Sequence, residues 1–117
     1  MTREERVRAA VEGREPDRVP VSVWMHISDK DQDSRSLAEA MVEFNEKYDY
    51  DFIKMMPFGA YTIPDWGAKL DIYCDKYKEV EIAASGISSI EDYRYIEPLP
   101  AIYGTWGKVL QLSQWME

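Results

Sequence analysis

Apolar residues alternate with other residues over 19–26, which read Val-Pro-Val-Ser-Val-Trp-Met-His. Because successive strand side chains point to opposite faces, this pattern predicts a strand whose valines share one face. The other face would carry Pro20, Ser22, Trp24 and His26. The chain's one histidine therefore lies where the strand runs out into a loop, and α/β folds gather functional groups at that end of a strand.

The pattern then changes to a helical period, which predicts a helix over 36–48 that is capped by Ser36. Its apolar residues recur at i, i+4, i+7 and i+11: Leu37, Met41, Phe44 and Tyr48. A compact apolar run over 50–56 predicts a second strand. Strand, helix and strand at this spacing form a βαβ unit, with two parallel strands joined by a right-handed crossover.

Local signals mark the remaining elements. Thr2 and Glu5 have capping-box spacing and start an N-terminal helix that Gly13 ends. The others are an aromatic loop over 58–67, a β-hairpin of 68–74 with 77–83, a helical turn over 88–95 and a helix over 105–116. These elements predict the α/β class in one domain, 1–117. The last helix ends without a glycine stop, so we expect this domain to be the N-terminal portion of a larger protein.

Charge and cysteine content narrow the class of protein. With 14 basic and 22 acidic residues, the net charge is −8, which disfavours nucleic acid and anionic membranes as partners. No apolar run approaches the roughly 20 residues that span a bilayer, and the N-terminus lacks the apolar core of a signal peptide. Cys74, the one cysteine, excludes an internal disulfide and is expected to be an inert buried thiol. We therefore expect a cytoplasmic protein.

A metal site within the chain is not expected. Zinc sites take three or four ligands, largely histidine and cysteine, and the chain has one of each. Asp29, Asp31 and Asp33 alternate in the loop after the first strand, but solvated loop charges explain them better than metal ligation.

Five segments of the chain resemble one known family. Residues 3–7 (Arg-Glu-Glu-Arg-Val), 13–21 (Gly-Arg-Glu-Pro-Asp-Arg-Val-Pro-Val) and 24–26 (Trp-Met-His) resemble the opening of the uroporphyrinogen decarboxylase superfamily. Residues 48–54 and 65–68 are also similar to it. The resemblance covers nearly all 117 residues, which correspond to about the first third of a family member.

This resemblance implies a partial (β/α)₈ barrel, with its active site at the C-terminal ends of the strands. The superfamily contains cofactor-free decarboxylases, and zinc-dependent methyltransferases that move methyl groups between corrinoid proteins and thiols or related acceptors. The decarboxylases carry an arginine-rich segment after the first strand and an aspartate after the second. In this chain the segment after the first strand, His26 to Lys30, contains no arginine. The place after the second strand is occupied by Met56-Pro57-Phe58, without an aspartate. The methyltransferase or demethylase branch therefore fits better.

The same resemblance sets expectations for cofactors and substrates. Zinc ligands of that branch lie in later strands, beyond Glu117, so this chain alone binds no cofactor. Zinc and a corrinoid partner would belong to a full-length protein, whose substrate would be a small molecule or a corrinoid protein. Such a barrel needs about 250 residues, so 117 residues would not be catalytically complete.

Each candidate site residue has a functional and a structural interpretation. In the functional interpretation, His26 acts as a general acid/base or orients a substrate; in the structural one, it is a core histidine hydrogen-bonded to the backbone. Trp24 would line a pocket or fill the barrel, and Lys54 would bind a substrate anion, pair with a carboxylate or lie at the strand edge. The remaining candidates for substrate binding, or else for loop packing, are in the aromatic loop: Tyr61, Asp65 and Trp66.

Two functions from different classes remain open. One is the N-terminal part of an enzyme barrel, with His26 in its pocket. The other is a free-standing remnant that acts as a non-enzymatic binding or oligomerisation module. A lone βαβ unit leaves strand edges unpaired, which predicts either a homo-oligomer or association with the remaining barrel portion.

Overall fold

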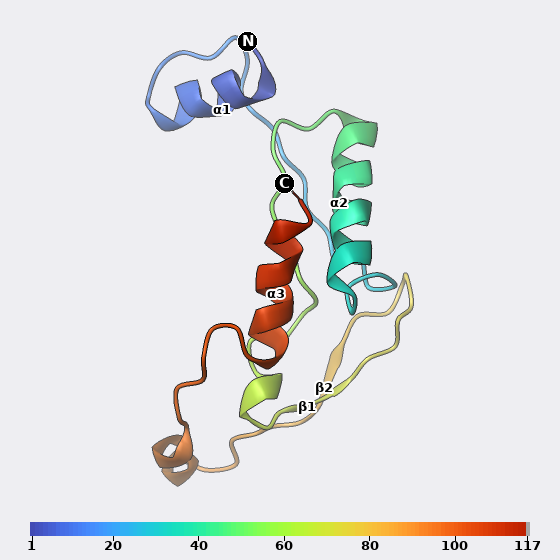
Figure 1. The fold of residues 1–117 in the computed structure, drawn as a ribbon, viewed down its shortest axis with the longest axis vertical. Helices are drawn as coiled ribbons and strands as arrows, with labels where there is room; N and C mark the ends of the chain where they lie inside the picture. Colours follow the sequence, from blue (N-terminus) through green and yellow to red (C-terminus); the bar gives the residue numbers. More distant parts are fainter. Residues whose placement is uncertain (117) are drawn as a thin grey trace.

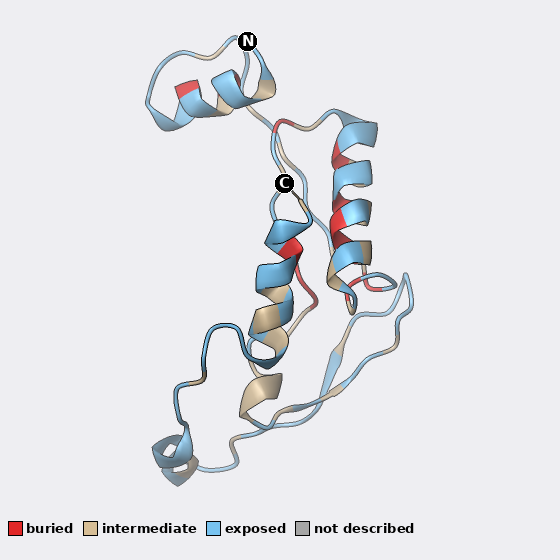
Figure 2. Cartoon of the chain, viewed as in Figure 1, coloured by how far each residue is buried: buried red, intermediate tan, exposed pale blue. Residues whose placement is uncertain are grey.

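Two helices packed side by side form the centre of the structure, a computed structural model that describes residues 1–116 (Figure 1). These helices, α2 (Ser34–Tyr48) and α3 (Gly104–Gln114), share a core formed by Leu37, Ala38, Met41 and Leu112. Within these two helices, the buried positions lie on the sides that face each other (Figure 2). In chain order the other elements are α1 (Arg3–Val11), η1 (Pro64–Trp66), β1 (Lys69–Asp71), β2 (Glu81–Ala84) and η2 (Ile90–Tyr95), the two η elements being 3-10 helices.

The three predicted helices form. α1 begins at the predicted capping box, in which the Thr2 hydroxyl accepts the Glu5 N–H and the Glu5 carboxylate accepts the Thr2 N–H. α3 begins one residue before the predicted start and ends at Gln114. The predicted cap of α2 at Ser36 is wrong: the Asp33 carboxylate accepts the Ser36 N–H at 2.8 Å, so the helix begins at Ser34.

The predicted strands over 19–25 and 50–56 do not form as strands. The two segments do run in the same direction beside each other, since Val21 contacts Asp51 near their starts and His26 contacts Pro57 at their ends. Only one backbone hydrogen bond joins them in the described chain, from Asp51 N–H to the Val21 carbonyl. Pro20 has no N–H to donate, and the Asp51 carboxylate takes the Val21 N–H. The parallel ladder is therefore missing.

An ion cluster stands at the starts of these two segments and attaches α1 to them. The fully buried Asp51 carboxylate accepts hydrogen bonds from Arg6 and Arg18, both at 2.5 Å, and from the Val21 N–H at 2.8 Å. Arg6 also forms a bidentate pair with Asp17. Burial alone would raise the pKa of Asp51, but the Val21 N–H and the two guanidinium groups lower it to about 2.

The predicted hairpin and helical turn are confirmed. β1 and β2 pair antiparallel, and a bridge between Asp75 and Lys78 closes the turn. Ser89 and Asp92 form the capping box of η2. The expectation of a buried Cys74 is wrong, because this thiol is exposed beside the turn, in a left-handed conformation with φ 51°. The sheet has only two strands, and neither face of it is covered well enough to bury a thiol.

The described chain is mixed α/β and extended, with principal dimensions of 53 × 32 × 22 Å. Its radius of gyration is 17.6 Å, against about 13 Å for a compact chain of this length. It exposes 8423 Å², about 1,800 Å² more than the roughly 6,600 Å² of a folded monomer of 13.7 kDa. No helix within residues 1–116 combines the length and the apolar character needed to cross a membrane.

Candidate functional site

His26 joins the C-terminal ends of the two extended segments. Its Nδ1 lies 3.1 Å from the carbonyl oxygen of Pro57. A carbonyl oxygen can only accept, so the contact assigns the hydrogen to Nδ1 and leaves Nε2 as the nitrogen free for chemistry. The two interpretations of His26 therefore coexist: one ring nitrogen bonds to backbone, as in the structural interpretation, and the other remains available.

Trp24 and Lys54 lie next to this histidine. The Trp24 and His26 rings meet edge to face, with centroids 6.2 Å apart. The Lys54 ammonium lies 4.1 Å above the centre of the Trp24 ring, within the range of a cation–π contact. The structure thus brings together three of the six predicted site residues, two from the first segment and one from the second.

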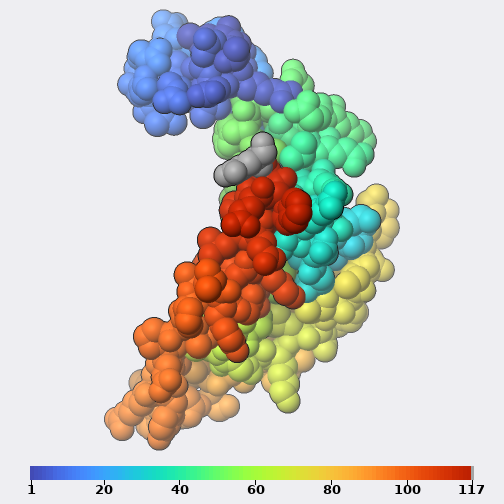
Figure 3. Space-filling model, viewed as in Figure 1, coloured from blue at the N-terminus to red at the C-terminus, as the bar shows by residue number. Residues whose placement is uncertain are grey.

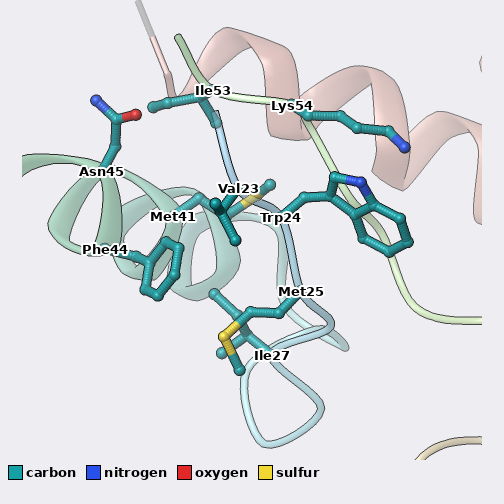
Figure 4. A pocket seen from close by; sticks show the side chains of 9 residues that line it. All are labelled: Val23, Trp24, Met25, Ile27, Met41, Phe44, Asn45, Ile53 and Lys54. Atoms are coloured by element: carbon teal, nitrogen blue, oxygen red, sulfur yellow. The ribbon is translucent and has the colours of Figure 1, made fainter. Parts of the chain in front are cut away.

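A small hollow separates these segments from α2 (Figure 4). It is lined by Val23, Met41, Phe44, Ile53 and neighbouring side chains, with Trp24 and Lys54 at its rim in Figure 4. Its volume of about 20 Å³ accommodates one water molecule rather than a substrate. A ligand would therefore lie on the outer side, against the Trp24 ring, which is 48% exposed.

Asp31 is a titratable group beside the histidine that the sequence analysis assigned to solvent. It is buried, and its carboxylate accepts a hydrogen bond of 2.8 Å from the Gln32 amide. Burial raises the pKa of Asp31, whereas the Gln32 amide and a positive charge on His26 act in the opposite direction. The expectation that all three loop aspartates are solvated is thus wrong, because Asp31 is buried and Asp33 caps α2.

Tyr61, Asp65 and Trp66 have the packing role that was their structural interpretation. The Asp65 carboxylate accepts the Thr105 N–H at 3.0 Å and the Thr105 hydroxyl at 3.2 Å, and so caps α3 from a distant loop. The Trp66 indole donates to the Glu97 carbonyl at 2.9 Å, and Tyr61 meets Trp106 edge to face. Within residues 1–116, none of their hydrogen bonds or ring contacts reaches Trp24, His26 or Lys54.

Replacing Asp65 with alanine should lower the free energy of unfolding by about 0.5–2 kcal/mol, the usual effect of losing a helix cap. Gly104, the first residue of α3, has φ 51° and no room for a Cβ against the Asp65 carboxylate, so the carboxylate packs directly on the start of the helix. Urea denaturation measures the loss. Asp65→Asn keeps an acceptor oxygen and should lose less; equal losses for both variants would contradict the capping role.

A metal ion has no ready set of ligands in the described part of the chain. Over residues 1–116, no three His, Cys, Asp or Glu side chains lie together so that they could hold one. The described residues therefore do not form a zinc site by themselves, and the groups that meet here are an imidazole, an indole and an ammonium group.

The geometry defines a mixed α/β chain in which two parallel extended segments lie beside each other, pack against one helix and present Trp24, His26 and Lys54 at their C-terminal ends. Comparison of the chain with protein-family models, with curated proteins and with solved structures gives no match.

Proposed function

We propose that this chain is the N-terminal portion of a uroporphyrinogen decarboxylase superfamily barrel, of the corrinoid-dependent methyltransferase or demethylase type. The observation that carries the proposal is the meeting of Trp24, His26 and Lys54 at the C-terminal ends of two parallel segments. Barrel enzymes build their sites at that end of their strands. Alone, the chain would be catalytically incomplete.

The unpaired backbone of the two segments supports a larger sheet. Over 22–26 and 52–56, no backbone group in the described chain bonds to another backbone group. Val19, Val21, Val23 and Met25, the apolar face of the first segment, are all more than 45% exposed. Further strands would pair these backbone groups and cover this face, as burial of a parallel sheet requires.

In this proposal the three residues that meet at the strand ends contribute to the pocket. His26 Nε2 accepts or donates a proton, or orients the substrate. Trp24 offers a flat apolar wall, and Lys54 attracts a substrate anion. The substrate is a small molecule or a corrinoid protein, and the zinc ligands and the corrinoid partner come from outside these residues. A cytoplasmic location is part of the proposal, since the one cysteine forms no internal disulfide.

A second candidate is a non-enzymatic binding or oligomerisation module. It is favoured by the excess exposed surface of about 1,800 Å² on one chain, which is more than the roughly 800 Å² that each partner of a standard protein interface buries. Such a module would cover the valine face with another subunit rather than with later strands of its own chain.

The mass of the native protein separates the two candidates. An antibody against residues 1–117 would recover the protein from its source cells. The enzyme proposal predicts a polypeptide two to three times the 13.7 kDa of this chain. It also predicts methyl transfer from a methylated corrinoid to a thiol in the presence of zinc. A 13.7 kDa polypeptide without methyl transfer would overturn the proposal in favour of the module.

A pair of substitutions then tests His26 in the recovered protein's sequence. His26→Asn keeps an amide donor close to the position of Nδ1 and removes Nε2, so it should preserve folding and lower kcat about 100-fold or more. His26→Gln instead places its amide near Nε2 and loosens the contact with Pro57. Full activity of His26→Asn would remove His26 from the chemistry and leave it a structural residue.

A further inference from the structure

A spur of the chain, residues 88–103, projects from the body and carries an unusual density of exposed apolar side chains. In Figure 3 it forms the orange end of the molecule that points away from the helices. Six large apolar residues of the spur are between 41% and 82% exposed: Ile90, Tyr93, Tyr95, Ile96, Ile102 and Tyr103. Interfaces between proteins are enriched in aromatic residues of this kind.

The exposed area matches one side of a protein interface. At about 200 Å² for a large side chain, these six residues expose roughly 800 Å². A standard interface buries about 800 Å² per partner, which is the area that these six residues expose. The spur therefore has the area needed to hold a partner of its own size.

Charge on the spur points to a second copy as the partner. Of the seven arginines, Arg94 is the only one without a carboxylate partner among residues 1–116, while the other six all form ion pairs. The side chains of Glu91 and Glu97, on the same spur, form no hydrogen bond or ion pair within the described chain. A symmetric dimer brings the same patch of two copies together, so Arg94 of each copy can meet a glutamate of the other.

The spur also carries both exposed side chains and a hollow. Ile90 and Tyr93 project from η2, and beside them lies a hollow of about 430 Å³ lined by Trp66, Tyr95 and Leu99 among others. Across a two-fold axis, the projecting side chains of one copy can enter the hollow of the other copy. The Asp92 capping box and Pro98 restrict the backbone of the spur, so less conformational entropy is lost on association.

We infer that the spur is the contact surface of a symmetric dimer of this chain, in which Arg94 of each copy pairs with Glu91 or Glu97 of its partner. This interface is separate from the valine face and from the site around His26. Dimerisation is measured by sedimentation and the proposed enzyme by methyl transfer, so the failure of one is distinguishable from the failure of the other.

Sedimentation equilibrium of the native polypeptide and of Arg94→Glu tests the inference. The unaltered protein should sediment at twice its polypeptide mass, and Arg94→Glu should weaken dimerisation at least tenfold, because attraction becomes repulsion at two symmetric sites. Arg94 has no partner within the described residues, so the variant should fold, and circular dichroism checks this. The matched control is Lys69→Glu, which reverses an exposed cation on β1, outside the spur, that forms no ion pair among the described residues.

Mixing two variants with reversed charges tests whether the ion pairs across the dimer can be restored. A chain with Glu91→Arg and Glu97→Arg should dimerise with the Arg94→Glu chain better than either does with itself, as measured by native mass spectrometry. A native protein that stays monomeric up to high concentration would overturn the inference. A dimer that Arg94→Glu does not weaken would overturn it too, by placing the interface elsewhere.

Discussion

Replacing Asp51 with alanine should destabilise the protein by about 3–5 kcal/mol, the usual consequence of removing one partner from a buried ion pair. The Asp51 side chain is fully buried, and its two oxygens serve Arg6, Arg18 and the Val21 N–H. Without the carboxylate, the Arg6 guanidinium would remain 10% exposed and lose one of its two carboxylates. Urea denaturation followed by circular dichroism measures the loss.

An exposed ion pair between α1 and α2 provides the control. Glu46 bonds to Arg3 at 2.9 Å, but its side chain is 64% exposed. Because exposed pairs contribute at most about 1 kcal/mol, Glu46→Ala should change the free energy of unfolding by less than that. Equal losses for Asp51→Ala and Glu46→Ala would show that the ion cluster does not hold α1 to the two segments.

The ion cluster also determines how stability depends on pH. The pKa of Asp51 is lowered to about 2, against about 3.9 in an unfolded chain, and the Arg6 guanidinium lowers the pKa of Asp17 as well. The folded protein therefore holds these carboxylates ionised more strongly than the unfolded chain does. Their contribution to the stability of the folded protein is complete above about pH 4 and is lost as the pH falls towards 2. In Asp51→Ala the loss of stability below pH 4 should be smaller.

Local signals in the sequence were sufficient to predict the helices and the hairpin, because a helix is held by bonds between residues three to four apart. The Thr2 capping box and the i, i+4 spacing of Leu37 and Met41 are such signals. The cap of α2 was misplaced by one turn because two polar residues, Asp33 and Ser36, both have the chemistry of an N-cap.

Whether the two predicted strands form depends on neighbouring strands that the sequence pattern does not specify. The alternation over 19–25 is compatible with an extended segment, yet the valines of its apolar face are exposed, and Ser22 and His26 are less so. A strand forms only where a neighbouring segment accepts and donates backbone hydrogen bonds along its length. Here the Asp51 carboxylate accepts the Val21 N–H, which is then not available to a backbone carbonyl.

The candidate site likewise contains contacts that the sequence predicts and contacts that it does not. Proximity of Trp24 and His26 follows from their spacing of two within one segment, and proximity of Lys54 follows from the parallel course of the second. Asp65, by contrast, contacts Thr105, forty residues away in the chain. No short-range pattern predicts such a contact, and the same holds for the burial of Asp31.

Replacing Leu112 with alanine should cost about 2–5 kcal/mol, because the leucine is 1% exposed and lies between α3 and α2. Together with Leu37 and Met41 it forms most of the only buried cluster described for residues 1–116, so little else in that core can compensate. Leu110→Ala is the matched control on the same helix; Leu110 is 45% exposed, and its loss should cost below about 1 kcal/mol. The two free energies come from urea denaturation. Near-equal losses would mean that α3 is not held by the core but by its Asp65 cap and by whatever covers its outer face.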